Sequence, residues 1–136
     1  MRLDLHHNIL AVSALGNTAI GTNTVTNGGI IDTKGYYALE FVLTSGALTD
    51  GNFVGSLEEG HTANLSDATP VAAENILGAF PSFGAADDNV LQQVGVRLGN
   101  KRYVRLKVTS TGVTTGGSLS AIALLANSQQ RPTLED

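Results

Sequence analysis

Apolar and polar residues alternate along most of the chain, and this two-residue period predicts strands. The stretches 37–44 and 53–58 both alternate in this way, each with one strongly apolar face. Between them lies the pair Asp50-Gly51, which is typical of a tight turn because glycine can adopt a positive φ. The sequence therefore predicts a first hairpin over residues 36–59.

Further strands are predicted toward both ends of the chain. In the N-terminal part, residues 8–15 and the short apolar segment 30–31 are strand-like. In the C-terminal part, strands are expected over 90–98, 102–109 and 119–125, with glycine-containing turns between them. The strands 90–98 and 102–109 are so close in the sequence that we expect them to form a second hairpin.

The register of this second hairpin follows from the requirement that apolar side chains share one face. A three-residue loop at 99–101 pairs Val96 with Val104 and Val94 with Leu106. A two-residue loop would instead place an arginine opposite a core valine. We therefore predict the three-residue loop, or an equivalent bulge.

Helical character is confined to residues 71–77, which follow Pro70 and end at Gly78, so at most two turns of helix are expected. This segment lies within the long irregular stretch 61–88. A loop of that length in a compact domain is usually a working surface or a covering flap.

Together these elements predict an all-β fold, a single-domain antiparallel β-sandwich with one short helix. We expect an N-terminal arm at residues 1–7, the sandwich domain at 8–126 and a polar C-terminal tail at 127–136. The length of 136 residues agrees with one domain, which would bury roughly two-thirds of the surface that the unfolded chain exposes.

Charged residues are scarce and unevenly distributed. They make up 15% of the chain, against about 25% in an average globular protein, and 8 Lys and Arg against 12 Asp and Glu leave a net charge of −4. Five of the 8 basic residues fall between positions 97 and 107, so the remainder has 12 acids, 3 bases and a balance of −9. A surface so poor in charge is typical of one that meets other protein.

In the predicted register, the outward face of the second hairpin carries Arg97, Tyr103, Arg105 and Lys107, with the Arg97 guanidinium close enough to stack on Tyr103. An ordinary solvated sheet face is one interpretation. A nucleic-acid surface is disfavoured, because one tyrosine offers little stacking and the acidic remainder would repel phosphates. The functional interpretation that we favour is a protein interface, where Arg and Tyr are enriched and would meet an acidic neighbour.

Motifs for catalysis or cofactor binding are not found in the sequence. The chain has no cysteine, no phosphate-binding loop and no nucleophile elbow. The adjacent His6 and His7 would face opposite ways on a strand, and residues 87–89 lack the alternating spacing of a calcium loop. Glu40 has no second carboxylate at the spacing of a glycoside hydrolase. We therefore expect no enzyme activity, no cofactor and no metal.

Membrane insertion and export are also not expected. No apolar run reaches the ~18 to 20 residues needed to cross a bilayer. The segment 9–15 is apolar enough for a short secretion signal, but Asp4 interrupts the basic region that should precede it. A first strand is therefore the preferred interpretation of this segment, in a protein made in a cytoplasm.

Several stretches resemble a family of small β-rich proteins that tailed phages encode among their head genes, close to the major capsid protein. The most specific match is 94–106, which reads VGVRLGNKRYVRL, and shorter ones lie at 32–36, 46–51, 57–59 and 77–80. Together they extend over about residues 30–126. The chain departs from the family in its opening segment, 3–7.

This resemblance implies a capsid decoration, or cement, protein, which would bind the outer surface of a phage head across junctions between major capsid protein subunits. It implies a location on the virion after synthesis in the host cytoplasm. We expect a homo-oligomer, either a dimer or a trimer, and no nucleic-acid or membrane partner.

Two alternatives stay open. One is another virion component, such as a tail or head-tail joining protein. The other is a virion-surface carbohydrate-binding module, which would need exposed aromatic side chains in a cleft.

Overall fold

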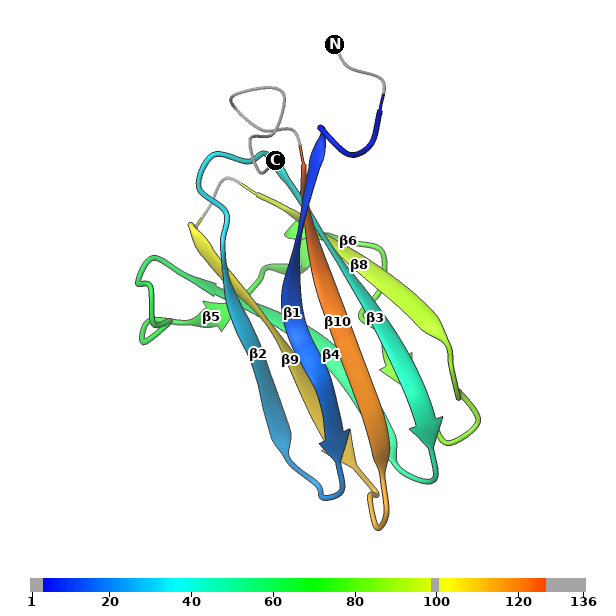
Figure 1. The fold of residues 1–136 in the computed structure, drawn as a ribbon. Coiled ribbons are helices and arrows are strands. Elements are labelled where there is room, and N and C mark those ends of the chain that lie inside the picture. Colours follow the sequence, from blue (N-terminus) through cyan, green and yellow to red (C-terminus); the bar gives the residue numbers. More distant parts are fainter. Residues whose placement is uncertain (1–3, 99–100, 127–136) are drawn as a thin grey trace.

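The computed structural model describes residues 4–98 and 101–126, and most of these residues form strands of two antiparallel sheets (Figure 1). Sheet A contains, in spatial order, β1 (Ile9–Ile20), β10 (Gly117–Ala126), β3 (Ala38–Leu48), β8 (Leu91–Arg97) and β6 (Ile76–Leu77). Sheet B contains β2 (Val25–Asp32), β9 (Tyr103–Thr111), β4 (Asn52–Gly60) and β5 (Thr69–Pro70), while β7 (Ser82–Phe83) also pairs with β4. The predicted all-β, single-domain sandwich is confirmed.

Consecutive long strands alternate between the two sheets. The long strands β1, β3, β8 and β10 belong to sheet A, whereas β2, β4 and β9 belong to sheet B. Each connection between them therefore crosses from one sheet to the other, and the turns after β1, β3 and β9 lie together at the lower end in Figure 1. This strand order is the connectivity of a jelly roll.

The alternation shows that both predicted hairpins are wrong. β3 and β4 do follow one another across the Asp50-Gly51 turn, where Gly51 has a φ of +95°. However, β3 pairs with β10 and β8, while β4 pairs with β9. In the same way β8 and β9 lie in different sheets, so the predicted pairing of Val96 with Val104 does not exist. The Asp50-Gly51 turn therefore connects a strand of sheet A to a strand of sheet B, rather than two paired strands of one sheet.

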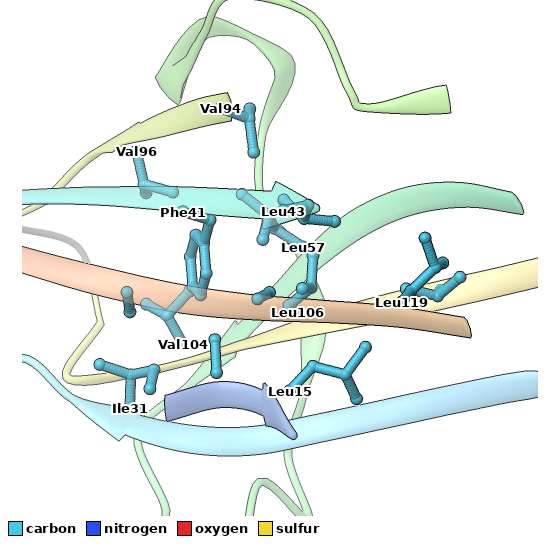
Figure 2. Packing of buried hydrophobic residues seen from close by; sticks show 14 of the residues in the cluster. Leu15, Ile31, Phe41, Leu43, Leu57, Val94, Val96, Val104, Leu106 and Leu119 are labelled. Atoms are coloured by element: carbon cyan, nitrogen blue, oxygen red, sulfur yellow. The ribbon is translucent and has the colours of Figure 1, made fainter. Parts of the chain in front are cut away.

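The side chains predicted to face inward are nevertheless buried. Val94 and Val96 from β8, and Val104 and Leu106 from β9, enter one core from opposite sheets (Figure 2). A strand that faces another across the core needs the same apolar alternation as a strand that pairs with it in one sheet. The pattern therefore indicates which side chains are buried without indicating which strands are hydrogen-bonded.

The stretch 61–88 contains less helix than the sequence predicted. Only Ala73–Asn75 are helical, as a single 3-10 turn, whereas up to two turns were expected over 71–77. Ile76 is already extended, with φ −92° and ψ 128°, and its backbone pairs with Val96 as part of β6. Pairing with β8 therefore ends the helix early.

β1 and β2 extend well beyond the predicted segments 8–15 and 30–31, and both strands contain bulges. The register of β1 on β10 shifts twice between Ser13 and Thr18, and the register of β2 on β9 shifts around Gly28. A Cβ at Gly28 would lie only 2.2 Å from the carbonyl oxygen of Ala14 in β1. Glycine at this position therefore lets β1 and β2 approach closely and joins the two sheets along this side.

The predicted terminal segments are only partly described. Residues 1–3 of the predicted arm, the whole predicted tail 127–136 and residues 99–100 of the predicted loop lie outside the described residues. The rest of the arm forms a turn before β1, in which the Asp4 carboxylate accepts a hydrogen bond from the backbone N–H of His7 at 3.0 Å.

Asp50 connects two turns at the lower end of the sandwich. Its carboxylate accepts hydrogen bonds from the backbone N–H groups of Thr114, Gly116 and Thr115, at 3.0, 2.9 and 3.1 Å. These three bonds hold the pKa of the Asp50 carboxyl below its ordinary value. The β3–β4 turn thereby supports the β9–β10 turn.

The core is filled from both sheets, and Phe41, Phe53 and Phe83 are its largest fully buried side chains. Phe41 lies on β3, in the middle of sheet A, and points toward the side chains of β9 and β4 (Figure 2). Because a packed interior relaxes only partly around a lost ring, its removal would leave a cavity.

We predict that Phe41→Ala lowers the free energy of unfolding by about 3 to 5 kcal/mol, through lost burial and the cavity. Val54→Ala, on the outer face of β4 in sheet B, should cost less than about 1 kcal/mol. Urea unfolding of both variants measures the difference. Equal losses would contradict the placement of Phe41 at the centre of the core.

Candidate protein-interaction surfaces

The structure separates the four residues predicted to form one interface. Tyr103, Arg105 and Lys107 alternate with buried residues of β9 and face outward from sheet B. Arg97 is the last residue of β8 and lies on the outer face of sheet A. The predicted stacking of Arg97 on Tyr103 is therefore wrong, and the Arg102 guanidinium instead lies 5.0 Å from the centre of the Tyr103 ring.

The cations of β9 are neutralised by an acid of the adjacent strand. Glu58 on β4 is directly opposite Arg105 and accepts a hydrogen bond from its Nη2 at 2.5 Å. The Nζ atom of Lys107 lies 3.3 Å from the other oxygen of the same carboxylate. Two cations therefore share one anion, and the group keeps a charge of only +1.

Glu58 is buried, and opposing effects act on its pKa. Burial of the carboxyl raises the pKa, but the hydrogen bonds from Arg105 and then Lys107 lower it by more. The net result is a pKa below the ordinary value of 4.5, so Glu58 is ionised at neutral pH.

Arg102 and Lys101, two further cations of the basic segment, also have partners within the chain. Arg102 donates two hydrogen bonds to the Asp32 carboxylate, at 2.8 and 2.7 Å. The Nζ of Lys101 donates to the hydroxyl of Thr69 at 2.9 Å. The outer face of sheet B is thus a charge-compensated polar surface rather than a bare positive patch.

A groove of about 350 Å³ runs along this face. Glu58, Lys107 and Ser56 form part of its lining, and the segment 68–71 with Phe80 forms the rest. The Phe80 ring is 41% exposed. The groove therefore offers an aromatic side chain beside a paired acid and base, a combination that suits docking of protein side chains.

The outer face of sheet A is different, because it is almost uncharged. Glu40 and Arg97 are the only charged residues within its five strands. Large apolar side chains are also exposed here, including Leu91 at 57% and Ile122 at 45%, although sheet B exposes Val54 and residues of β2 as well. The low charge together with these exposed side chains makes the outer face of sheet A a candidate interaction surface.

A second groove, of about 410 Å³, lies on sheet A, and its lining includes Tyr37, Leu77, Leu124 and both charged residues. Glu40 extends over Gly95, where a Cβ would lie 2.5 Å from the Glu40 Oε1. Within residues 4–98 and 101–126, no hydrogen bond or ion pair reaches the side chain of Glu40 or Arg97. Sequence analysis singled out Arg97, but it gave no reason to place Glu40 beside it.

The other polar residues considered in the sequence stabilise turns. Asp87 accepts a hydrogen bond from the Gly84 N–H at 2.7 Å, and Asp88 accepts one from the Leu48 N–H at 2.9 Å. In the part of the chain that the structure describes, no three His, Asp or Glu residues are grouped as a metal site would require. The same residues include no helix long and apolar enough to span a membrane.

Comparisons with known proteins find the fold but no family. No family model matches the chain, and no curated protein sequence matches it. Among solved structures, the SPBc2 prophage-derived protein YomS is similar, with a TM-score of 0.53 and 9% identity over 88% of this chain and 94% of YomS. VP2 of the infectious bursal disease virus subviral particle has a TM-score of 0.46 and 10% identity over 91% of this chain and about one third (33%) of VP2. At these identities the likeness concerns the fold.

We predict that Glu58→Gln lowers the free energy of unfolding by about 2 kcal/mol at neutral pH, because Arg105 and Lys107 lose their common counter-charge. The pKa of Glu58 is depressed in the folded state, so its stabilisation is present above the ordinary value of 4.5 and is lost as the pH falls through the folded-state value. The difference between wild type and variant should therefore shrink in acid.

Urea unfolding at neutral pH and at about pH 3 measures this difference. Glu74→Gln is the matched control, because Glu74 is an exposed acid on the 3-10 turn. A loss at Glu58 that is no larger than the loss at Glu74, or one that persists unchanged in acid, would contradict the shared ion pair.

Proposed function

We propose that this protein is a virion structural protein of a tailed phage, and specifically a capsid decoration protein that binds the outside of the head. Its partner would be the major capsid protein, and it would join the particle after synthesis in the host cytoplasm. The jelly-roll connectivity supports the proposal, because viral capsid domains often use this architecture. The fold shared with a prophage-derived protein supports it too.

The observation that carries the proposal is the presence of two different grooved surfaces, each a candidate for protein contact, on opposite outer faces of one sandwich. One surface is the grooved polar face of sheet B and the other is the apolar face of sheet A. A small domain with two such faces is suited to bridging neighbours.

The sheet B face is the better candidate for contact with the capsid. Interfaces between proteins that fold separately are about as polar as ordinary surface, and Arg and Tyr are enriched in them. Tyr103, Arg105 and Lys107 provide such a surface beside the groove that contains Phe80. In this proposal Arg105 is held in place by Glu58, while Tyr103 and Lys107 contact the capsid.

Bridging explains how moderate contacts would stabilise a head. A standard contact buries about 800 Å² on each partner, and a single contact of this size need not be tight. When one molecule spans two or three subunits, release of any one contact is reversed by those that remain. Stabilisation therefore depends on simultaneous binding.

We predict that purified protein binds phage heads that lack it and restores their resistance to heat and low salt. Sedimentation of heads with bound protein, followed by a thermal stability assay of the particles, measures both effects. The decoration role would be wrong if the protein failed to bind and the bare heads were as resistant as complete ones.

Lys107→Glu should weaken head binding by about tenfold or more, because it places two acids side by side in the contact surface. Lys34→Glu is the matched control, since Lys34 is an exposed cation in the β2–β3 connection, away from the groove. If Lys107→Glu and Lys34→Glu bound heads equally well, the assignment of the capsid contact to sheet B would be wrong. Electron microscopy with labelled protein distinguishes a head position from a tail position.

A further inference from the structure

The outer face of sheet A does not resemble the surface of a domain that stays alone in water. The five strands of sheet A contain only two charged residues, Glu40 and Arg97, and both line the same groove. Tyr37 at its margin is 63% exposed, and Leu91 and Ile122 are exposed along the neighbouring strands. Large exposed apolar side chains on a face with so few charges make this face a candidate for contact with another protein.

The two charges on this face are close together but do not pair with each other. Arg97 is opposite Ala38, and Glu40 is opposite Gly95, so Arg97 and Glu40 are diagonal neighbours on adjacent strands. No ion pair joins them, and neither side chain has another partner among the described residues. This contrasts with Arg105 on β9 and with Arg102 directly before it, which are both paired within the chain.

We propose that the outer face of sheet A is the interface of a homodimer, in which a second copy of this chain covers it about a two-fold axis. In a two-fold interface each subunit offers the same patch, so residue i meets residue j and j meets i. A patch with one acid and one base satisfies this condition. Arg97 of one subunit then meets Glu40 of the other, and the pair forms twice.

A second copy fits this face better than a capsid subunit does. Homodimer interfaces are more apolar than interfaces between proteins that also exist apart, and they are depleted in charge at their centre. A different partner would have to present its own base and acid in the matching positions, whereas a second copy presents them automatically. The polar face of sheet B, on the other side of the domain, remains free for another partner.

The size of the face agrees with a dimer. Neighbouring strands lie about 4.8 Å apart and a strand of 10 residues, such as β10, is about 33 Å long, so the four long strands present roughly 600 Å² as a flat surface. A standard interface buries about 800 Å² on each partner, measured over the side chains rather than as a flat area. Packing of one sheet face on another is also how sheets A and B form the core of the domain.

The dimer does not depend on the proposed capsid role. It is tested on the purified protein with no phage particle present, so its failure and the failure of head binding are separate results. A dimer whose sheet B faces point outward would in addition offer two capsid-binding surfaces.

Sedimentation velocity of the purified protein over micromolar concentrations should show a dimer. Ile122→Asp places an unpaired carboxylate from each subunit in the apolar contact, and it should raise the dimer dissociation constant by at least about a hundredfold. Val54→Asp is the matched control, because Val54 is 41% exposed on the outer face of sheet B and Ile122 is 45% exposed on sheet A. That variant should remain a dimer.

A charge exchange tests the proposed pairing itself. Arg97→Glu leaves only acids at both contacts and should weaken the dimer by about tenfold or more. The double variant Glu40→Arg with Arg97→Glu should recover most of this loss, which a general effect on folding would not do. Lys34→Glu makes the same change of charge at an exposed position in the β2–β3 connection, outside the lining of the sheet A groove, and should leave the dimer intact.

Several results would overturn the proposal. A monomeric wild type would do so, as would a dimer that Ile122→Asp leaves unchanged or that Val54→Asp disrupts equally. If the double variant Glu40→Arg with Arg97→Glu did not recover the dimer, the proposed pairing of Glu40 with Arg97 would be wrong. A monomeric wild type that loses head binding on Ile122→Asp would assign this face to the capsid instead.

Discussion

Both sheets bury alternate side chains in one shared core, and this burial determines which side chains face outward on each sheet. Phe41 from sheet A and Leu106 from sheet B enter that core from opposite sides. Because side chains on a strand alternate between its two faces, each buried residue directs its neighbours outward. The outward positions of Lys107 on sheet B and of Arg97 on sheet A follow directly. Packing of the core therefore determines the composition of the outer faces of sheets A and B, which are the two candidate interaction surfaces.

The sequence was sufficient to predict the fold class and the buried residues, but not the pairing of strands. Val94 and Leu106 were correctly placed inside, and the turn at Asp50-Gly51 was correctly located. Local alternation is the same whether two consecutive strands pair in one sheet or face each other across a core. Which of these occurs depends on strands far away in the sequence, such as β10 beside β3, whose contacts leave no local pattern.

The candidate surfaces were predictable only in part for the same reason. The basic segment was visible as a cluster of charge, but its compensation by Glu58 depends on a contact between residues 47 positions apart. A like argument applies to Arg97, whose neighbour Glu40 comes from a strand that the predicted hairpins placed elsewhere. The charge count along the chain therefore overestimated the positive charge on the outer face of sheet B. It also did not reveal that the outer face of sheet A is almost uncharged.

We propose that one sandwich uses its two outer faces for different partners, sheet B for the capsid and sheet A for a second copy. An electron cryomicroscopy reconstruction of decorated heads tests it most directly, because the orientation of each domain becomes visible. The account predicts that sheet B faces the head surface while sheet A packs on sheet A of a neighbouring copy. Density in which sheet A faces the head, or in which single copies stand apart, would contradict it.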